Sequence, residues 1–325
     1  MAVKVTAEIK RLLDARARRV IDGQAMIAGL LEELRRQIVD ELLAVPEGSY
    51  AAYGLKQKLA SIEQHIGRFS GQAGSALAGL VRGAWDDGED LVLGVGRAVG
   101  LYTAFGHVST ALLETLQEFA VHKIADVGAS AFAQVRAEIT LGVLGQKTPW
   151  EVAQAIAGEI KDSPIPTIAG RPVFKSVAER AEVITGVEMG RAFSQASQLA
   201  MEQAAKNVPG LKKQWWHAGH PKQPRVSHLA LHGQIKPVDK PFMVGTLTMM
   251  FPRDPKAPAS EVIRCGCEVV PWHEAFGTDN ALPIYNERGE EIARRGPRSG
   301  DDDPLAGKFT RGRIDRTGGK GTRSR

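Results

Sequence analysis

Apolar side chains recur at steps of three and four residues over residues 9–43, with Arg, Asp and Glu between them. This spacing puts the apolar positions on one helical face and predicts one long amphipathic helix or two consecutive ones. Pro46 and Gly48 are expected to end the helical region, because neither residue favours its continuation. Gly23 and Gly29 are the positions where the helix is expected to be weakest.

A second helical block, rich in alanine and glycine, is predicted over residues 53–145, with an interruption near residues 86–88. Within this block, residues 91–113 are long enough to span a bilayer, which needs about 20 apolar residues. Arg97 and several glycines argue against that interpretation, because a charge inside a bilayer is costly. The stretch is therefore expected to form a buried helix pair, and no membrane partner is expected.

Two capping boxes mark further helices. Thr148 is followed three residues later by a glutamate, which predicts a helix over residues 149–160. A loop with three prolines is expected over residues 163–172. Ser176 begins the second capping box and opens a helix that is expected to end near residue 206.

The pattern changes after residue 210. Trp215 and Trp216 lie in a short strand-like run, and residues 261–270 alternate with β-branched neighbours, which is typical of a strand. Seven prolines between residues 221 and 258 indicate ordered loops. Residues 211–276 are therefore predicted to form a small α+β module.

The predicted fold class is mainly α, with a long helical N-terminal region, a small α+β C-terminal module and a disordered basic tail. Residues 1–147 are expected to be a helical partner-docking region, and residues 148–210 to be connecting helices. Residues 211–276 form the module, and residues 277–325 are expected to be a flexible tail, because they contain too few large apolar residues to offset chain entropy.

Composition narrows the class of protein. Hydrophobic residues make up 43% of the 325 residues and charged residues 24%, which are ordinary globular values and exclude wholesale disorder. The chain has only two cysteines, so a disulfide framework is excluded and a reducing compartment is expected. The first nineteen residues mix acidic and basic side chains and lack the apolar run of a secretory signal.

The positive charge is concentrated at the end of the chain. The formal net charge is +5, whereas the last eighteen residues alone carry seven basic residues against Asp315, a net charge of +6. A basic segment without aromatic residues favours contact with the phosphates of double-stranded DNA, and a solvated tail that only aids solubility is the alternative. The predicted DNA-binding residues are Lys308, Arg311, Arg313, Arg316, Lys320, Arg323 and Arg325.

Five of the eight histidines and both cysteines lie between residues 215 and 273. Cys265 and Cys267 are two apart, so in a strand their thiols would lie on one face. His228 and His232 are four apart, so in a short helix over residues 226–232 they would also share a face. Two thiolates and two imidazoles suit a tetrahedral structural zinc site. Buried cysteines with structural histidines, or catalysis by a Cys–His pair, remain alternatives.

Four sequence blocks resemble the carboxy-terminal domain of phage Mu F-like minor head proteins: Arg225–Gln234, Pro237–Phe242, Pro252–Pro255 and Glu261–Cys267. Some members of that family have a Cys-x-x-Cys pair and a further histidine here. In this sequence Arg225 and His228 occupy the positions of the pair, and Val262 occupies that of the histidine. The resemblance therefore leaves His228, Cys265 and Cys267 as the matching set.

The resemblance implies a head-morphogenesis protein that associates with the portal or the major capsid protein and is present in few copies. The expected location is the virion head, and the host cytoplasm during assembly. An enzyme is less expected than a structural protein. A toxin or processing enzyme that uses the His/Cys module and a plain nucleic-acid-binding protein are the alternatives.

Four further residues in these blocks are expected to be structural. Ser227 is predicted to cap a local turn, and Arg225 to pair with a carboxylate. Asp254 and Glu261 are assigned to the same scaffold, although an active pocket could use the same residue types.

Overall fold

The computed structural model describes most of the helical region and the module. The described residues are 2–44, 52–100, 108–143, 147, 151–156, 165–168, 171–174, 176–217, 225–276, 282–285, 291–295 and 298–299. They form a mainly helical protein with short strands near the C-terminus, which confirms the predicted fold class. The basic residues from Lys308 to Arg325 lie outside the described residues.

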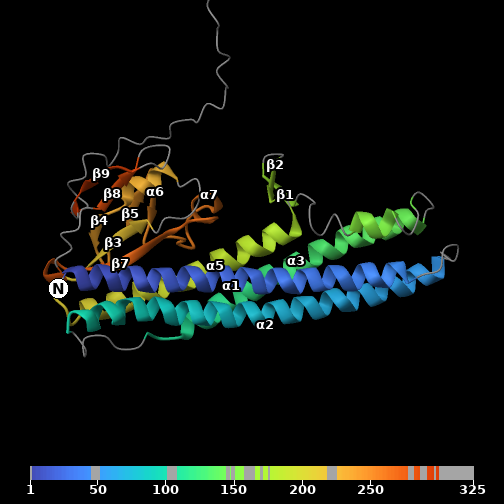
Figure 1. Ribbon diagram of the computed structural model, residues 1–325, viewed down its shortest axis with the longest axis horizontal. Coiled ribbons are helices and arrows are strands. Elements are labelled where there is room, and N and C mark those ends of the chain that lie inside the picture. Colours follow the sequence, from blue (N-terminus) through green and yellow to red (C-terminus); the bar gives the residue numbers. More distant parts are fainter. Residues whose placement is uncertain are drawn as a thin grey trace, which may run out of the picture.

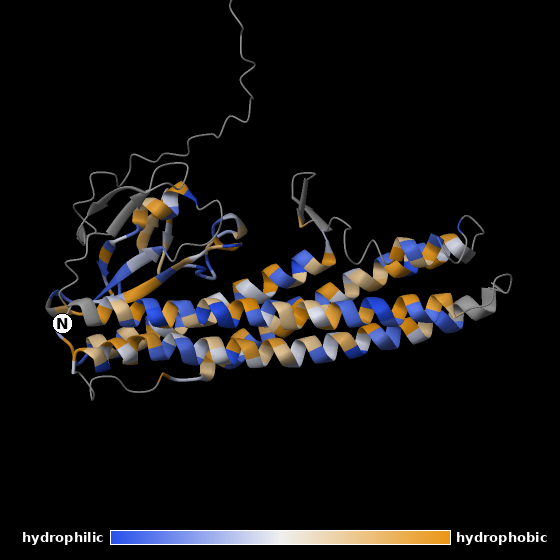
Figure 2. Ribbon diagram, in the orientation of Figure 1, coloured by the Kyte–Doolittle hydropathy of each residue, from blue (hydrophilic) through white to orange (hydrophobic). Residues whose placement is uncertain are grey.

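Long helices run side by side through most of the molecule (Figure 1). They are α1 (Ala2–Leu43), α2 (Ala52–Ala98), α3 (Ala111–Val143) and α5 (Val177–Ala205). Hydrophobic and hydrophilic positions alternate along α1 and α2 (Figure 2), as the apolar periodicity predicts. The core between the helices is built mostly from Ala, Val, Leu and Ile side chains.

The predicted interruption near residues 86–88 is wrong, because α2 continues through it. Gly88 lies where α5 crosses α2, and a Cβ atom there would overlap with the carbonyl oxygen of Phe193. Ser197 donates a hydrogen bond of 2.9 Å to the Gly88 carbonyl at the same crossing. The glycine permits a close helix contact instead of breaking the helix. Likewise, α1 is continuous through Gly23 and Gly29.

The helix α5 begins where the capping box predicts. The Ser176 hydroxyl accepts a hydrogen bond of 3.1 Å from the backbone N–H of Glu179. The helix then packs against both α1 and α2 and buries Phe193 and Met189 among them. It is therefore an integral member of the bundle.

A hairpin replaces the loop that was predicted over residues 163–172. Its strands β1 (Ile165–Ile168) and β2 (Arg171–Phe174) are antiparallel, with Ile165 opposite Phe174. Both strands of a two-stranded ribbon are edges, and edge strands tolerate the missing N–H of proline. Prolines alone were therefore a misleading signal for a loop. Of the helix predicted over residues 149–160, residues 151–156 are described and are helical.

The module lies over the end of the bundle that holds the N-terminus of α1 (Figure 1). Within the described residues, its main sheet has the order β10-β4-β3-β7. Strand β3 (Lys212–His217) is antiparallel to β4 (Gln234–Pro237) and to β7 (Cys267–Trp272), and β10 (Arg298–Ser299) is parallel to β4. A hairpin of β5 (Phe242–Val244) and β6 (Leu247–Met249), the short helices α6 (Val226–Leu231) and α7 (Ala259–Val262), and a 3-10 turn (Glu274–Phe276) complete it.

Two expectations about the module need correction. Residues 261–270 are not one strand, because α7 ends at Val262 and β7 begins only at Cys267. Arg264 has a φ of 54° in the turn between them, so Cys265 lies in a turn. In addition, β8 (Leu282–Tyr285), β9 (Glu291–Arg295) and β10 lie in the segment predicted as a tail. Backbone pairing needs no long apolar run, which is why low apolar content missed these strands.

In the part of the chain that the structure describes, no helix combines the length and the apolar character that a bilayer crossing requires.

Candidate metal centre

Three predicted ligands meet at the junction of α6, β7 and the turn before β7. His228 lies in the middle of α6, Cys267 is the first residue of β7, and Cys265 lies in the turn. Their ligand atoms all lie within 4.8 Å of one another. Among the described residues, these three form the one group of His, Cys, Asp or Glu side chains whose ligand atoms are close enough to hold a metal ion.

The separations suit a tetrahedral ion. His228 Nδ1 lies 3.4 Å from Cys265 Sγ and 3.8 Å from Cys267 Sγ. Zinc holds sulfur at about 2.3 Å and imidazole nitrogen at about 2.0–2.1 Å, so tetrahedral geometry separates the two ligand atoms by about 3.5 Å. The observed distances lie on either side of that value. The three side chains could therefore coordinate one ion with only small movements.

Glu261 holds the opposite edge of the His228 ring. The ring Nε2 lies 2.9 Å from a carboxylate oxygen of Glu261, which comes from α7. A neutral ring that donates from Nε2 leaves the Nδ1 lone pair directed toward the thiols. A carboxylate behind a metal-binding histidine orients the ring and raises its basicity. Trp215 packs its ring edge-on against His228 at 5.6 Å between centroids.

The two thiols have different electrostatic environments. The hydrogen bond from Cys267 lowers the pKa of Cys265 well below its usual range, and His228 and Arg253 act in the same direction. Burial raises the pKa of Cys267 well above its usual range. Burial lowers the pKa of His228, but the hydrogen bonds with Cys265 and Glu261 outweigh it and raise that pKa overall. The lowered pKa favours a thiolate at Cys265, next to His228, and the thiolate is the form of cysteine that binds metal ions.

A buried ion-pair cluster attaches this site to the helices. Arg253 donates to the Cys265 carbonyl at 2.6 Å and to Ser194 Oγ of α5 at 3.0 Å, and it pairs with Glu268 of β7. Arg16 of α1 also pairs with Glu268, at 2.8 Å. The cluster therefore connects the turn that carries Cys265 to α1 and α5.

His232, the fourth predicted ligand, lies outside the group. Its Nδ1 accepts a hydrogen bond of 2.8 Å from the backbone N–H of His217. Burial, with a smaller contribution from His217, lowers the pKa of His232 to about 3, so the ring stays neutral. Because the residue follows the last residue of α6 and has left helical geometry, the four-residue spacing does not align it with His228.

A different histidine lies close to the thiols. His217 Nδ1 is 3.5 Å from Cys267 Sγ. The two residues are directly opposite each other in the β3–β7 pair. The sequence shows that His217 belongs to the histidine-rich region, but only the strand register identifies it as the neighbour of Cys267.

Of the four predicted scaffold residues, Glu261 and Arg225 lie beside His228. Arg225 donates to the carbonyls of Ser260 and Ile263 at 2.6 Å each, and its guanidinium lies 3.9 Å from Glu261. Asp254 accepts from the backbone N–H groups of residues 250 and 256 and so holds the loop before α7. The prediction for Ser227 is wrong, because the N-cap residue of α6 is Arg225 and no side chain caps that helix.

The fold and the site together define a helical-bundle protein that carries a His/Cys cluster of the metal-binding type. The chain is 33% identical over 131 residues to YqbB of Bacillus subtilis (strain 168), a protein described as uncharacterized. The matched part is 39% of this chain and 40% of that protein, so the chain spans well under half of the relative's length. No family model and no solved structure match the chain.

Proposed function

We propose that this chain is a minor head protein of a tailed phage or prophage that acts in capsid assembly. The observation that carries the proposal is the resemblance of four separated sequence blocks to phage Mu F-like minor head proteins. In the structure these blocks contact one another. Residues 225–234 contact residues 261–267 through the pair His228–Glu261, and residues 252–255 contact them through Arg253 and Cys265. Mutual contact supports the view that the blocks are parts of one structural unit.

The helices are proposed to dock on the portal or on the major capsid protein. Large apolar side chains remain exposed on α1 and α3, although they are normally buried in helical bundles. We propose that they contribute apolar area to the docking surface. The exposed residues are Ile21, Met26 and Leu43 on α1 and Leu112 and Phe119 on α3.

The experiment that tests the head proposal is mass spectrometry of purified particles from a strain that carries the gene. The chain should be present in particles from the wild-type strain. Deletion of the gene should produce defective or empty heads, and supply of the chain in trans should restore them. Particles that assemble and package DNA normally without the chain would refute the proposal.

The metal is proposed to be zinc. Two thiolates and an imidazole are soft and borderline ligands, which zinc accepts in structural sites. His228, Cys265 and Cys267 supply three ligands. His217 lies outside that group of mutually close ligand atoms, but its Nδ1 is 3.5 Å from Cys267 Sγ, so it is proposed as the fourth ligand after a movement of its side chain. The bound ion would hold α6, β3 and the start of β7 together. Its role would be structural.

Metal analysis tests this assignment directly. We expect about one equivalent of zinc in protein purified without chelator. Chelation should lower the melting temperature, because zinc at 100 times its Kd stabilises a folded protein by about 2.7 kcal/mol. His217→Ala should weaken zinc binding, whereas His232→Ala should leave the zinc content unchanged. Protein that contains no zinc and is unaffected by chelator would identify the thiols as buried core residues.

A cysteine hydrolase is the second candidate. Cys265, His228 and Glu261 are arranged in space as a nucleophile, a general base and a carboxylate that orients the base. The thiol lies 3.4 Å from the ring, and the ring lies 2.9 Å from the carboxylate. Alkylation with iodoacetamide separates the candidates. Rapid modification of Cys265 in metal-analysed, fully folded protein would favour the hydrolase, whereas protection that chelator removes would favour the zinc site.

A further inference from the structure

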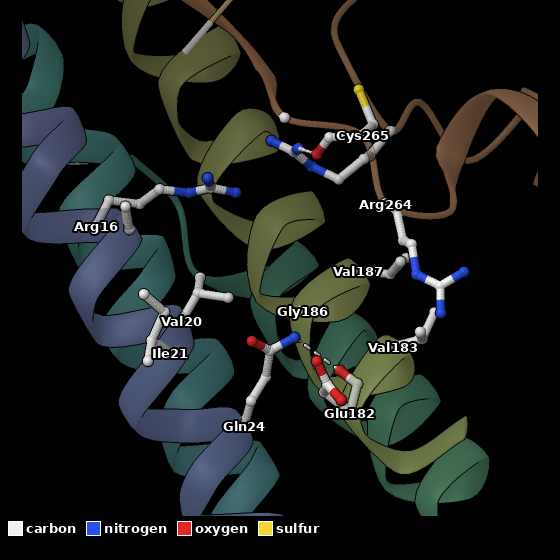
Figure 3. Close-up of a pocket in the computed structure, with 13 residues that line it drawn as sticks. Arg16, Val20, Ile21, Gln24, Glu182, Val183, Gly186, Val187, Arg264 and Cys265 are labelled. Carbon is white, nitrogen blue, oxygen red and sulfur yellow. Dashed lines mark hydrogen bonds between the residues drawn. The ribbon is translucent and has the colours of Figure 1, made fainter. Parts of the chain in front are cut away.

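The helix α1 occupies a corner of the bundle. Both α1 and α3 pack against α2 and α5, so α1 and α3 lie at opposite corners. Arg16, Val20 and Gln24 point from α1 toward α5 (Figure 3), and the Gln24 side chain donates a hydrogen bond of 3.0 Å to the Glu182 carbonyl. On the opposite side of α1, side chains are exposed from one end of the described helix to the other.

One line of exposed positions follows that outer side in steps of seven and four residues. Such steps return to nearly the same side of an α-helix, because the helix turns once in 3.6 residues. The members of the line, all exposed, are Ala7, Asp14, Arg18, Ala25, Glu32, Arg36 and Leu43. The steps are the same in both directions from Ala25. A second copy of α1 that runs in the opposite direction can therefore place each position of its line opposite a position of the first.

The middle of the outer side is apolar. Ile21 and Met26 are 59% and 52% exposed, and Ala25, Ala28 and Gly29 are exposed among them. A Cβ atom at Gly29 would meet no other atom within 4 Å, so the helix is open to close approach here. Small side chains at a contact let two helices pack closely. If a second copy covers this apolar patch symmetrically, the two-fold axis must pass near Ala25.

The charges on either side of the patch agree with that axis. In an antiparallel pair centred on Ala25, positions equally far from the axis face each other, so Arg18 faces Glu32 and Asp14 faces Arg36. The side chains of Glu32 and Arg36 are 61% and 66% exposed, so both are accessible to a partner. In a parallel pair in register, each charged residue would face its own copy, and like charges repel. The charge pattern therefore favours the antiparallel arrangement.

We propose that the outer side of α1 binds the same surface of a second copy of this chain, antiparallel and with Ala25 at the two-fold axis. Such a contact uses the same patch on both copies, so it closes at two chains and does not extend into a filament. The inference goes beyond the proposed function. Leu112 and Phe119 of α3, at the opposite corner of the bundle, stay exposed in this dimer for the docking proposed above.

Sedimentation equilibrium of the full chain between about 1 and 100 μM tests the proposal, because a contact of this kind is expected to dissociate on dilution. The wild-type chain should change from monomer to dimer within that range. Ala25→Glu would place two carboxylates against each other at the axis and should raise the Kd of the dimer at least about tenfold. Ala15→Glu is the control, because Ala15 is exposed on α1 but lies off the line. It should leave the Kd unchanged.

A charge reversal tests the antiparallel register. Arg18→Glu would place a carboxylate opposite Glu32 twice in each dimer and should raise the Kd at least about tenfold. The double variant Arg18→Glu/Glu32→Arg restores opposite charges at both contacts, so its Kd should return to within about threefold of the wild-type value. A parallel pair in register would not be rescued, since like charges would still face each other. Circular dichroism checks that each variant is folded.

Three results would overturn the proposal. A wild-type chain that stays monomeric over the whole range would leave the outer side of α1 to the portal or the capsid protein. Equal Kd values for Ala25→Glu and Ala15→Glu would place the dimer contact elsewhere. A double variant that is as weak as Arg18→Glu alone would contradict the antiparallel register.

Discussion

Glu268→Gln is a conservative substitution that the structure predicts to be strongly destabilising. Glu268 is fully buried, accepts hydrogen bonds from Arg253 and Ser194, and forms an ion pair with Arg16. The glutamine has nearly the same shape, so the core loses no volume. It removes the one carboxylate that two buried guanidinium groups share. The variant therefore isolates the electrostatic contribution of the cluster.

The expected loss is about 3–5 kcal/mol, the usual cost of removing one partner of a buried ion pair. The loss is also expected to couple the two parts of the molecule, because Arg16 belongs to α1 and Ser194 to α5, whereas Glu268 belongs to β7. The bundle and the module should unfold together in the wild-type protein. In Glu268→Gln, the module should unfold at lower denaturant than the bundle.

Urea unfolding followed by far-ultraviolet circular dichroism and by tryptophan fluorescence measures both effects. Circular dichroism follows mainly the long helices of the bundle, whereas three of the five tryptophans, Trp215, Trp216 and Trp272, lie in the module, so transitions that differ between the two probes would report separate unfolding. Glu63→Gln is the control, because Glu63 is exposed on α2. In the double variant with Arg16→Gln, the loss should be smaller than the sum of the two single losses. A Glu268→Gln protein within about 0.5 kcal/mol of wild type, the range of ordinary surface changes, would refute this reasoning.

Three further predictions concern the bundle, the module and the tail. Gly88→Ala should destabilise the protein by about 1–3 kcal/mol, because the added Cβ would overlap with the backbone of α5. Gly67→Ala, where the added Cβ meets open space, should stabilise it by about 0.5–1 kcal/mol. Melting curves of both variants test the two expectations. His232 has its pKa lowered to about 3, so the unfolded chain binds more protons below about pH 6.5 and stability should fall by about 2 kcal/mol between neutral pH and pH 5. His232→Asn, which keeps an acceptor for the His217 N–H, should flatten that part of the stability profile; equal slopes would contradict it. Deletion of residues 308–325 should remove most of a salt dependence of DNA binding whose slope is about −5, and an unchanged slope would place DNA binding elsewhere.

The sequence predicts the bundle well because helical periodicity is local. Ser176 and the apolar spacing of residues 9–43 identify helices that the structure contains. The errors arise where the role of a residue is determined by a contact with a residue that is distant in the sequence. Gly88 has the sequence signature of a helix break, but its role is set by α5, which is more than one hundred residues away. The hairpin over residues 165–174 was missed because strand pairing between proline-containing segments leaves no periodic signal.

The candidate site was predicted only in part, because some of its residues are brought together by contacts between distant segments. Residue type and spacing were sufficient to select His228, Cys265 and Cys267. Spacing was misleading for His232, since α6 ends one residue before it. His217 could be selected only from the register of β3 against β7. Arg16 and Glu268 were not selected at all, because an arginine on an amphipathic helix has no feature that indicates burial against a strand 250 residues later.

Protease protection of the chain in purified phage particles tests the central proposal most directly. In intact DNA-filled heads, the chain should resist a protease that cleaves it in free solution. After the heads are opened, the same protease should digest it at the same rate as the free protein. Absence of the chain from particles, or its digestion in intact heads, would contradict a minor head protein inside the capsid.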